Sequence, residues 1–371
     1  MKYYIISGEA SGDLHGSNLI KALSKLDDNA EFRCWGGEMM QQQGATLVKH
    51  YKDLAFMGFV EVIRNLPTIL NNLSFCKKDI TDYCPDVIIL VDYPGFNLRI
   101  AKWAKENTFK VVYYISPQIW AWKENRIHAI KKCIDKMLVI LPFEKAFYSK
   151  WNYPVEYVGH PLVEVIEDYK KSNTSNHNPL STEESVIALL PGSRKQEILK
   201  KLPIMLEVCG HFTQYQFVVA MAPGIDAEFY TSLLTEYKNV KAVRGKTYDL
   251  LSIATAALVT SGTATLETAL FEVPEIICYK GSKVSYWIAK KLIKIKFIGL
   301  VNLIMNKEVV KELIQDELTP ANLIKELSLM LNDDTKKEQI KKNYSQLKAL
   351  LSEGGHASSN AASSIISFLD K

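Results

Sequence analysis

The sequence predicts an α/β protein of two domains, each with a parallel sheet covered by helices on both faces. Three observations lead to this fold class. The chain has 371 residues, which is too long for one simple core and fits two domains. Short β-branched, apolar runs alternate with amphipathic stretches, which is the pattern of a parallel sheet packed between helices. This alternation stops at residues 170–184, a polar stretch with many Ser, Asn and Thr residues, and then begins again.

The first domain is expected to span residues 1–169, and residues 170–184 form the predicted linker. Five apolar runs in this domain have the length and composition of buried strands, and helical stretches separate them. The runs are Tyr3–Ser7, Phe32–Trp35, Val87–Val91, Val111–Ile115 and Met137–Leu141.

The second domain is expected to span residues 185–350. Its strand-like runs are Val186–Leu190, Gln216–Ala220, Ala256–Thr260 and Glu275–Cys278. From Val309 onward the chain is predicted to be almost wholly helical, and it ends in an Ala/Ser-rich helix, Ala357–Leu369. We expect residues 351–371 to pack back on the first domain or on a partner subunit.

Composition and charge exclude several functions. The formal net charge of +4 is too small to indicate a nucleic-acid-binding protein. No apolar run reaches the ~18 residues that a membrane span needs. The amino-terminal segment Lys2–Ser7 runs straight into Gly8 and Glu9, without the longer apolar region and cleavage site of a secretory signal. The sequence therefore predicts a cytoplasmic protein.

The cysteines and acidic residues give no sign of a metal site. The six cysteines are scattered without a Cys-x-x-Cys pair, and the chain contains neither Asp-x-Asp nor His-x-His. We therefore expect reduced cysteines, no metal and no cofactor.

The turn Ser7–Asp13 follows the first strand and precedes a helix expected at about Leu14–Leu26. In sheets of this kind ligands lie outside the carboxyl ends of the strands, where helix N-termini present free N–H groups. Glu9, Ser11 and Asp13 are candidates for contacts with sugar hydroxyls or a phosphate. The turn matches neither the dinucleotide fingerprint nor the P-loop. Capping of the helix by Ser11 or Asp13 explains the same residues equally well.

Asp92 is the best candidate for a general base. It directly follows the apolar run Val87–Val91, where burial of a charge is costly unless the charge has a partner. A carboxylate at this position is therefore unlikely to be there for packing. The alternative is a structural cap for the following helix, and Asn97 can do the same job.

The segment Ser116–Trp122 follows another strand and carries two tryptophans. Gln118 and Trp120, together with Asn97 of the preceding loop, are assigned to the acceptor or sugar side, and an indole can form an apolar wall for a sugar ring or an acyl chain. Packing under the loop is the alternative. Arg126 and His128 follow on the next helix, where either can face a phosphate or simply be solvated.

Two turns of the second domain are predicted to bind a diphosphate. Gly192, Ser193 and Arg194 join a strand to a helix, and place a guanidinium beside free backbone N–H groups. Ser261, Gly262 and Thr263 do the same after the run Ala256–Thr260, with Glu267 on the same helix face as Thr263. A diphosphate at these turns, with Glu267 on the ribose hydroxyls, makes a nucleotide-diphosphate site. Ordinary helix capping is the alternative.

An apolar helix face is predicted after Ala55. The members of this candidate lipid or membrane patch are Phe56, Met57, Phe59, Val62, Ile63 and Leu66. Core packing is the alternative.

Eight motifs, in order along most of the chain, resemble the bacterial lipid-A-disaccharide synthase family. They are SGEASGD at Ser7–Asp13, MGFVEV at Met57–Val62, DYPGFN at Asp92–Asn97, SPQIWAW at Ser116–Trp122, LPFEKAFY at Leu141–Tyr148, LLPGSR at Leu189–Arg194, SGTATLE at Ser261–Glu267 and VVKEL at Val309–Leu313. The resemblance implies a glycosyltransferase-B fold: two Rossmann-like domains facing across a cleft, with C-terminal helices crossing back to the first. The first domain would then be the acceptor side and the second the UDP-sugar side.

The resemblance also implies an activity. This is transfer of 2,3-diacylglucosamine from its UDP conjugate to the 6-hydroxyl of 2,3-diacylglucosamine 1-phosphate, with inversion, without metal and with release of UDP. The implied partners are these two lipids, the cytoplasmic face of the inner membrane, which the protein would touch peripherally, and a second copy of the chain through the C-terminal helices. Other activities left open are a UDP-sugar epimerase, another UDP-sugar transferase on this fold, and a non-catalytic sugar-nucleotide binder.

The resemblance carries over to individual residues. Asp92 matches the proposed general base, Arg194 matches a residue needed for activity, and Asn302 matches a further position on the nucleotide side. Gly95 departs from the family, because many relatives have a second acid there. Asp92 is therefore expected to act alone or with Glu9 or Asp13.

Overall fold

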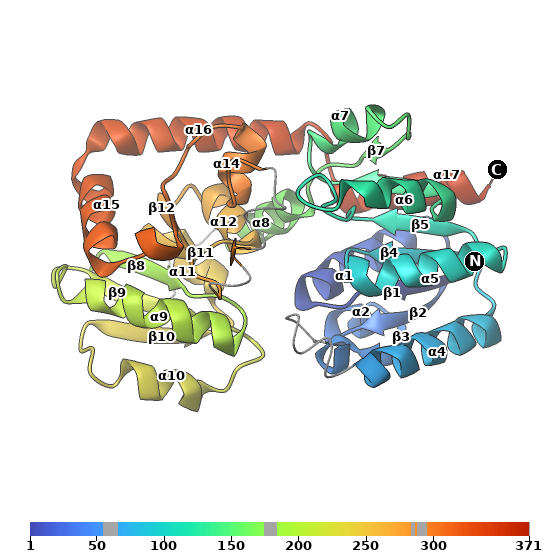
Figure 1. Ribbon diagram of the computed structural model, residues 1–371, viewed down its shortest axis with the longest axis horizontal. Coiled ribbons are helices and arrows are strands. Elements are labelled where there is room, and N and C mark those ends of the chain that lie inside the picture. The colour runs from blue at the N-terminus through green and yellow to red at the C-terminus, as the bar shows by residue number, and fades with distance from the viewer. Residues whose placement is uncertain (55–65, 174–183, 283–285, 288–294, 371) are drawn as a thin grey trace. The chain divides into compact units, whose positions relative to one another are not determined.

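The computed structural model describes residues 1–54, 66–173, 184–282, 286–287 and 295–370, and its chain divides into two compact units. The first unit is Met1–Pro161 with Leu351–Lys371, and the second is Leu162–Leu350. Each unit has its own parallel sheet (Figure 1).

The first sheet has seven parallel strands in the order β3-β2-β1-β4-β5-β6-β7. The strands are β1 (Lys2–Ile6), β2 (Glu31–Gly36), β3 (Thr46–His50), β4 (Val87–Val91), β5 (Val111–Tyr114), β6 (Lys136–Val139) and β7 (Glu156–Tyr157). β1 pairs with both β2 and β4, so the chain reverses its direction of winding between β1 and β4. A reversal of this kind is the topological switch point of a doubly wound sheet.

Helices cover both faces of the first sheet. They are α1 (Ala10–Leu23), α2 (Glu38–Gln42), α4 (Leu66–Tyr83), α5 (Pro94–Glu106), α6 (Ile127–Cys133), α7 (Glu144–Ser149) and α17 (Ala357–Leu369), with short η1 (Tyr51–Leu54) and η2 (Glu124–Arg126). α4, α5 and α6 share one core with Tyr4, Ile88 and Leu90 of the sheet. Along each strand, the residues that face this core alternate with residues that face the other side of the sheet.

α17 returns to the first unit and packs beside α1 (Figure 1). Ala357, Ala361 and Ile365 of α17 are fully buried. The predicted return of the C-terminal helix to the first domain is therefore confirmed. Because this apolar face is already covered within the chain, a homodimer through α17 would have to use the helix's other face.

The second sheet has six parallel strands in the order β10-β9-β8-β11-β12-β13. The strands are β8 (Val186–Leu190), β9 (Gln216–Met221), β10 (Val240–Arg244), β11 (Ala254–Thr260), β12 (Glu275–Tyr279) and β13 (Glu312–Ile314). β8 pairs with both β9 and β11, which places a second switch point between β8 and β11.

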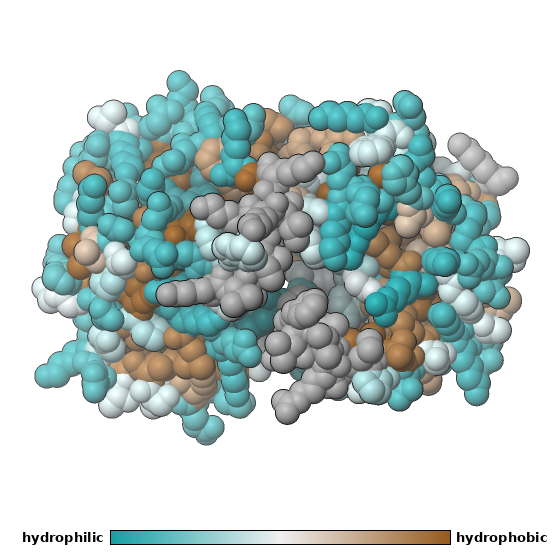
Figure 2. Space-filling view, viewed as in Figure 1, coloured by the Kyte–Doolittle hydropathy of each residue, from teal (hydrophilic) through white to brown (hydrophobic). Residues whose placement is uncertain are grey.

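The helices of the second unit are α8 (Pro161–Ser172), α9 (Lys195–Cys209), α10 (Ala227–Leu234), α11 (Thr247–Ile253), α12 (Thr263–Leu270), α14 (Leu300–Met305), α15 (Pro320–Asn332) and α16 (Asp334–Ser352), with η3 (Gln315–Glu317). α9, α10 and α15 share a core with β8, β9 and β11. Hydrophilic side chains cover most of the face in Figure 2, and hydrophobic ones gather over α9 and α10.

Two expectations about boundaries differ from the structure. The stretch from Val309 onward is not wholly helical, because Glu312–Ile314 forms edge strand β13. α8 also groups with the second unit, whereas we expected residues up to 169 in the first. The Tyr169 ring contacts the rings of Tyr248 and Phe271, and these aromatic contacts attach α8 to that unit. Of the predicted linker, residues 174–183 lie outside the described residues.

Candidate functional site

Four of the turns that carry predicted site residues lie at the two switch points. In the first unit the turns after β1 and β4 carry Ser7–Asp13 and Asp92–Asn97, and these two strands are hydrogen-bonded neighbours. In the second unit the turns after β8 and β11 carry Gly192–Arg194 and Ser261–Thr263, and these strands are also neighbours. Switch points are where open α/β sheets bind their ligands, so each unit has one candidate site.

Asp92 lies in a constrained turn between β4 and α5. Asp92 and Tyr93 both have positive φ angles, 46° and 49°, a region that non-glycine residues rarely occupy. The backbone carbonyl of Asp92 accepts hydrogen bonds from the Tyr113 hydroxyl at 2.5 Å and from the Asn97 amide at 2.8 Å. These two bonds hold the turn in the unusual conformation and so fix where the Asp92 carboxylate points.

The Asp92 carboxyl has a strongly shifted acidity. Burial, helped by the negative charges of Glu9 and Glu144, raises the pKa of Asp92 to about 7, although the Tyr93 N–H acts in the opposite direction. A carboxylate with a pKa near neutrality accepts a proton far better than an ordinary one. The group therefore has the acidity of a general base that works at neutral pH.

Glu144 is a site residue that the sequence analysis did not single out. It is 1% exposed, at the start of α7. Its carboxylate accepts hydrogen bonds from the Ser116 hydroxyl at 2.5 Å and the Trp120 indole N–H at 3.1 Å. The other oxygen accepts from the backbone N–H groups of Ile140 and Leu141. Glu144 thus anchors the Ser116–Trp122 segment near Asp92.

A signal for Glu144 was present in the sequence. It follows the strand-like run Met137–Leu141 by three residues, inside one of the motifs shared with the synthase family. An acidic residue directly after a buried strand is unlikely to serve packing alone, because burial of a charge is costly. This argument selected Asp92, and it applies to Glu144 as well.

Three predicted acceptor-side residues lie on the turn after β1. The helix α1 begins at Ala10, earlier than expected, so Ser11 and Asp13 lie in its first turn and Glu9 is its N-cap residue. Glu9 acts on the pKa of Asp92 and so belongs to the same site. Gly8 packs against the Tyr93 ring, where a Cβ atom would come within 2.5 Å of the ring carbons.

Asp13 has its carboxylate engaged by the backbone. It is 2% exposed and accepts hydrogen bonds from the N–H groups of Gly37, Met39 and Met40, at 2.8, 3.1 and 3.1 Å. It holds the turn between β2 and α2, so a direct contact with a ligand would require these bonds to break.

Asn97 and Gln118 have different surroundings. Asn97 is fully buried, and its amide also donates to the carbonyls of Ile6 and Val91 at 3.3 Å, which ties the ends of β1 and β4 together. Gln118 is exposed beside Trp120, where its amide is accessible to a ligand. Gly95 is exposed, and a Cβ atom there meets nothing within 4 Å, so the fold leaves room for a larger side chain at this position.

The turn after β8 is tight and contains Arg194. Gly192 has a φ angle of 121°, and a Cβ atom there would come 2.7 Å from Glu197. Arg194 is the N-cap residue of α9 and its guanidinium pairs with Glu197 at 3.1 Å. Ser193 is exposed. The turn can present backbone N–H groups and a guanidinium to an anion.

The turn after β11 lies beside it. A Cβ atom on Gly192 would be 3.6 Å from the Thr260 methyl group, so the two turns approach closely. Gly262 is the N-cap residue of α12, which begins at Thr263, and the Ser261 hydroxyl donates to the carbonyl of Ile298.

Glu267 on α12 accepts a hydrogen bond from the Tyr248 hydroxyl at 2.9 Å. Burial raises the pKa of Glu267, and the Tyr248 bond acts in the opposite direction. The carboxylate is thus held in one orientation and keeps a second oxygen for a further donor.

Asn302 on α14 is fully buried and bonded within the protein. Its amide donates to Val310 and Glu312, and its oxygen accepts from the N–H groups of Val309 and Val310. The side chain ties α14 to the residues that lead into β13, so we interpret it as a positioning residue.

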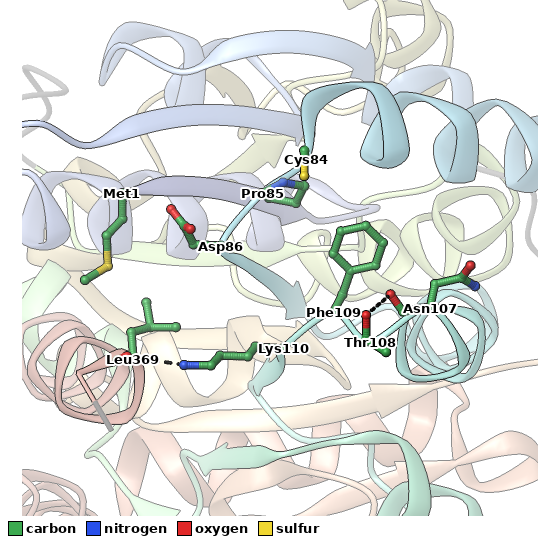
Figure 3. A pocket seen from close by; sticks show the side chains of 9 residues that line it. All are labelled: Met1, Cys84, Pro85, Asp86, Asn107, Thr108, Phe109, Lys110 and Leu369. Atoms are coloured by element: carbon green, nitrogen blue, oxygen red, sulfur yellow. Dashed lines mark hydrogen bonds between the residues drawn. The ribbon is translucent and has the colours of Figure 1, made fainter.

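The cavity in Figure 3 lies away from these turns. Its lining includes Met1, Asp86 and Lys110, which lie just before β1, β4 and β5, together with Leu369 of α17. It is therefore at the amino edge of the first sheet, opposite the edge that carries Asp92. Lys110 donates to the Leu369 carbonyl across it.

In the described ranges no three His, Cys, Asp or Glu side chains come together in a way that could hold a metal ion. No helix in the described part of the chain is long and apolar enough to cross a bilayer. The predicted patch residues Phe56, Met57, Phe59, Val62 and Ile63, and the Leu66 side chain, lie outside the described residues.

Solved structures share this fold. The UDP-GlcNAc 2-epimerase from Neisseria meningitidis bound to UDP-GlcNAc has a TM-score of 0.68 at 13% identity, covering 100% of this chain and 99% of that one. The glycotransferase of kitacinnamycin gives 0.68 at 13% identity, with 99% of both chains covered. The likeness confirms the glycosyltransferase-B type of α/β fold.

Sequence comparison identifies the family. The model described as lipid-A-disaccharide synthetase matches residues 3–366. The lipid-A-disaccharide synthase of Syntrophus aciditrophicus is 39% identical over 360 residues, covering 95% of this chain and 94% of that protein. That of Geobacter metallireducens is 37% identical over 373 residues, covering 99% and 97%. The chain therefore belongs to the lipid-A-disaccharide synthase family.

Proposed function

We propose that the protein is the glycosyltransferase that transfers 2,3-diacylglucosamine from its UDP conjugate to the 6-hydroxyl of 2,3-diacylglucosamine 1-phosphate. Membership of the family over residues 3–366 supports lipid-A-disaccharide synthase activity. The observation that carries the mechanism is the Asp92 carboxyl at the switch point of the first sheet, whose pKa is raised to about 7.

In the proposed reaction Asp92 takes the proton from the acceptor hydroxyl. The hydroxyl oxygen then attacks the anomeric carbon of the donor from the face opposite the leaving group, so the configuration inverts. The bond between that carbon and the diphosphate oxygen breaks, and its electron pair leaves with UDP. The carbonyl bonds from Tyr113 and Asn97 keep the base oriented for this transfer.

The second unit is proposed to bind the departing diphosphate. The N-termini of α9 and α12 carry free N–H groups and partial positive charge, and Arg194 adds a guanidinium. Gly192, Ser193, Ser261, Gly262 and Thr263 supply the turns, and Glu267 would accept hydrogen bonds from the ribose. Because this assignment meets the diphosphate charge with protein groups, turnover should persist in the presence of a chelator.

The acceptor is proposed to bind at the first unit. Glu9 and Ser11 lie at the start of α1, after the strand that pairs with β4, and Gln118 and Trp120 lie on the segment anchored by Glu144. Since both substrates carry acyl chains, we propose peripheral contact with the cytoplasmic face of the inner membrane. A homodimer through the C-terminal helices stays a prediction.

The test is an assay of the purified protein with the diacylated UDP-sugar and the monosaccharide phosphate. We expect a disaccharide product by thin-layer chromatography and one UDP released for each disaccharide, with and without a chelator. Asp92→Asn should lower turnover by about 100-fold or more, the range for removal of an acid–base group, and should bind UDP nearly normally by calorimetry.

Asp82→Asn is the matched control. Asp82 is an exposed acid on α4, so turnover should stay at the wild-type rate. Near-normal turnover of Asp92→Asn would remove Asp92 from the role of base. A third incubation with the UDP-sugar alone distinguishes other activities: an epimer would indicate an epimerase, and no release of UDP with both substrates present would indicate a binding protein.

A further inference from the structure

An exposed tryptophan beside the Asp92 site carries two cations on its ring. Trp122 is 46% exposed, in the connection between β5 and α6. The Lys123 ammonium lies 4.3 Å from the centre of its ring, and the Arg126 guanidinium carbon lies 5.7 Å from it. Cation–π contacts of this length hold both charges close together.

The two cations have no acidic partner in the described part of the chain. Among the residues that the structure describes, no carboxylate comes within ion-pairing distance of Lys123 or Arg126, whereas Arg33 and Arg194 each pair with an acid. Partial burial lowers the pKa of both side chains, and Arg126 lowers that of Lys123 further. Two like charges held close together without an acidic partner repel each other, and an anion that binds both relieves this repulsion.

The pair lies close to the candidate base without being bonded to it. The Arg126 charge acts on the Tyr113 hydroxyl, and that hydroxyl bonds the Asp92 carbonyl at 2.5 Å. The groups that shift the pKa of Asp92 are Glu9, Glu144 and the Tyr93 N–H, and Arg126 is not among them. The guanidinium therefore lies near the hydroxyl that holds Asp92 in place and does not itself act on the Asp92 carboxyl.

We infer that Lys123 and Arg126, held on Trp122, bind the phosphate monoester of the acceptor sugar while Asp92 faces the hydroxyl at the other end of that sugar. This inference rests on the proposed function. A guanidinium and an ammonium together suit a phosphate, because the first offers a planar fork of donors and the second a compact charge. The phosphate of an anionic lipid has the same chemistry and is the competing source.

The main test compares two acceptors, 2,3-diacylglucosamine with and without its 1-phosphate. The wild type should prefer the phosphorylated acceptor. Arg126→Gln and Lys123→Gln should each raise the KM for that acceptor by about tenfold, the loss expected for one charge-assisted hydrogen bond. The preference should largely disappear in the double variant, while the KM for the UDP-sugar stays constant. Arg126→Lys should keep part of the preference.

Lys132→Gln is the control, because Lys132 is an exposed cation on the same helix α6. It removes one positive charge and should leave both KM values unchanged. Lys123 is also exposed, so Lys123→Gln keeps the test available if Arg126→Gln fails to fold.

Two binding measurements distinguish the source of the phosphate and do not depend on turnover. Glucosamine 1-phosphate should bind the wild type by calorimetry and bind the double variant more weakly, whichever sugar transfer the protein performs. Sedimentation with phosphatidylglycerol vesicles should be the same for the wild type and the double variant. Retained acceptor preference in the double variant would overturn the inference, and loss of vesicle binding with unchanged acceptor preference would assign the cations to membrane lipid. Absence of any disaccharide with the wild type, combined with binding of glucosamine 1-phosphate that needs both cations, would overturn the proposed function alone.

Discussion

The hydroxyl of Tyr113 donates a hydrogen bond to the backbone carbonyl of Asp92 over 2.5 Å. Tyr113 belongs to β5 and Asp92 follows β4, so the bond links the ends of two neighbouring strands. The bond supports Asp92 in a backbone conformation with a φ angle of 46°. Such a conformation costs on the order of 1 kcal/mol or more and needs support from its surroundings. The base is thus positioned through its backbone.

Removal of this hydroxyl should reduce catalysis more than substrate binding. Tyr113→Phe keeps the ring, so we expect kcat to fall by about tenfold and stability by about 1 kcal/mol, with the KM for the UDP-sugar unchanged. Tyr153→Phe is the matched control, since its hydroxyl bonds the Ile134 carbonyl at 3.1 Å within the core. It should lower the melting temperature similarly and leave kcat intact. Equal kcat values for the two variants would contradict a positioning role for Tyr113.

The pH dependence of kcat/KM should report the acidity of Asp92. Because the base must be deprotonated and its pKa is raised to about 7, kcat/KM should rise about tenfold per pH unit below pH 7 and level off above it. The Glu9 charge contributes to this increase, so Glu9→Gln should lower the pKa of Asp92 and move the profile to lower pH. Glu31→Gln removes an equal charge at the amino end of β2 and should not move it. An unshifted profile in Glu9→Gln would show that Glu9 does not act on the base.

UDP affinity should depend on the Arg194 guanidinium. Arg194→Ala should weaken UDP binding by about tenfold, the loss of one charge-assisted bond, as measured by calorimetry. Glu197→Gln should strengthen it modestly, because Glu197 pairs with Arg194 at 3.1 Å and competes with the diphosphate. Lys200→Ala, an exposed cation on α9, is the control. UDP affinity unchanged in Arg194→Ala would count against the diphosphate assignment.

A buried acid in the second unit should make stability depend on pH. Burial, with the charge of Glu312 nearby, raises the pKa of Glu275 well above its ordinary value, so the folded state keeps this proton when the unfolded state has lost it. The free energy of unfolding should therefore fall as the pH rises above about 4.5, the range in which an unfolded glutamate ionises. Glu275→Gln should flatten this dependence between pH 5 and 8, measured by thermal melts. Glu308→Gln, at an exposed site, should keep the wild-type slope. A wild-type slope in Glu275→Gln would show that another group is responsible.

The strands that the sequence predicted and those that it missed differ in their place in the sheets. All nine predicted strands are interior ones, where both faces are covered and the apolar run is continuous. The four missed strands, β3, β7, β10 and β13, are the two edges of each sheet. An edge strand is partly solvated, as in the mixed pattern of Val240–Arg244, so it leaves no continuous apolar run to detect.

Asp92 was predictable and its environment was not. An acid directly after Val87–Val91 is a local signal that needs no knowledge of the fold. Glu9, Tyr113 and Glu144 reach Asp92 only because β1, β4, β5 and β6 lie in succession in the sheet. Asp13 and Asn302 are residue types that often bind ligands, yet in the folded chain their side chains bond backbone groups of the protein, Asp13 those after β2 and Asn302 those before β13.

The sequence by itself determined the two parallel sheets, the turns that hold the candidate site, Asp92 and the family motifs. Each of these features depends on residues that are close together along the chain. The tertiary structure alone decided the order of the strands, the acidity of Asp92, and which polar side chains stay free for a ligand. These depend on burial and on the distance between charges, and both are set by segments that meet only when the chain folds.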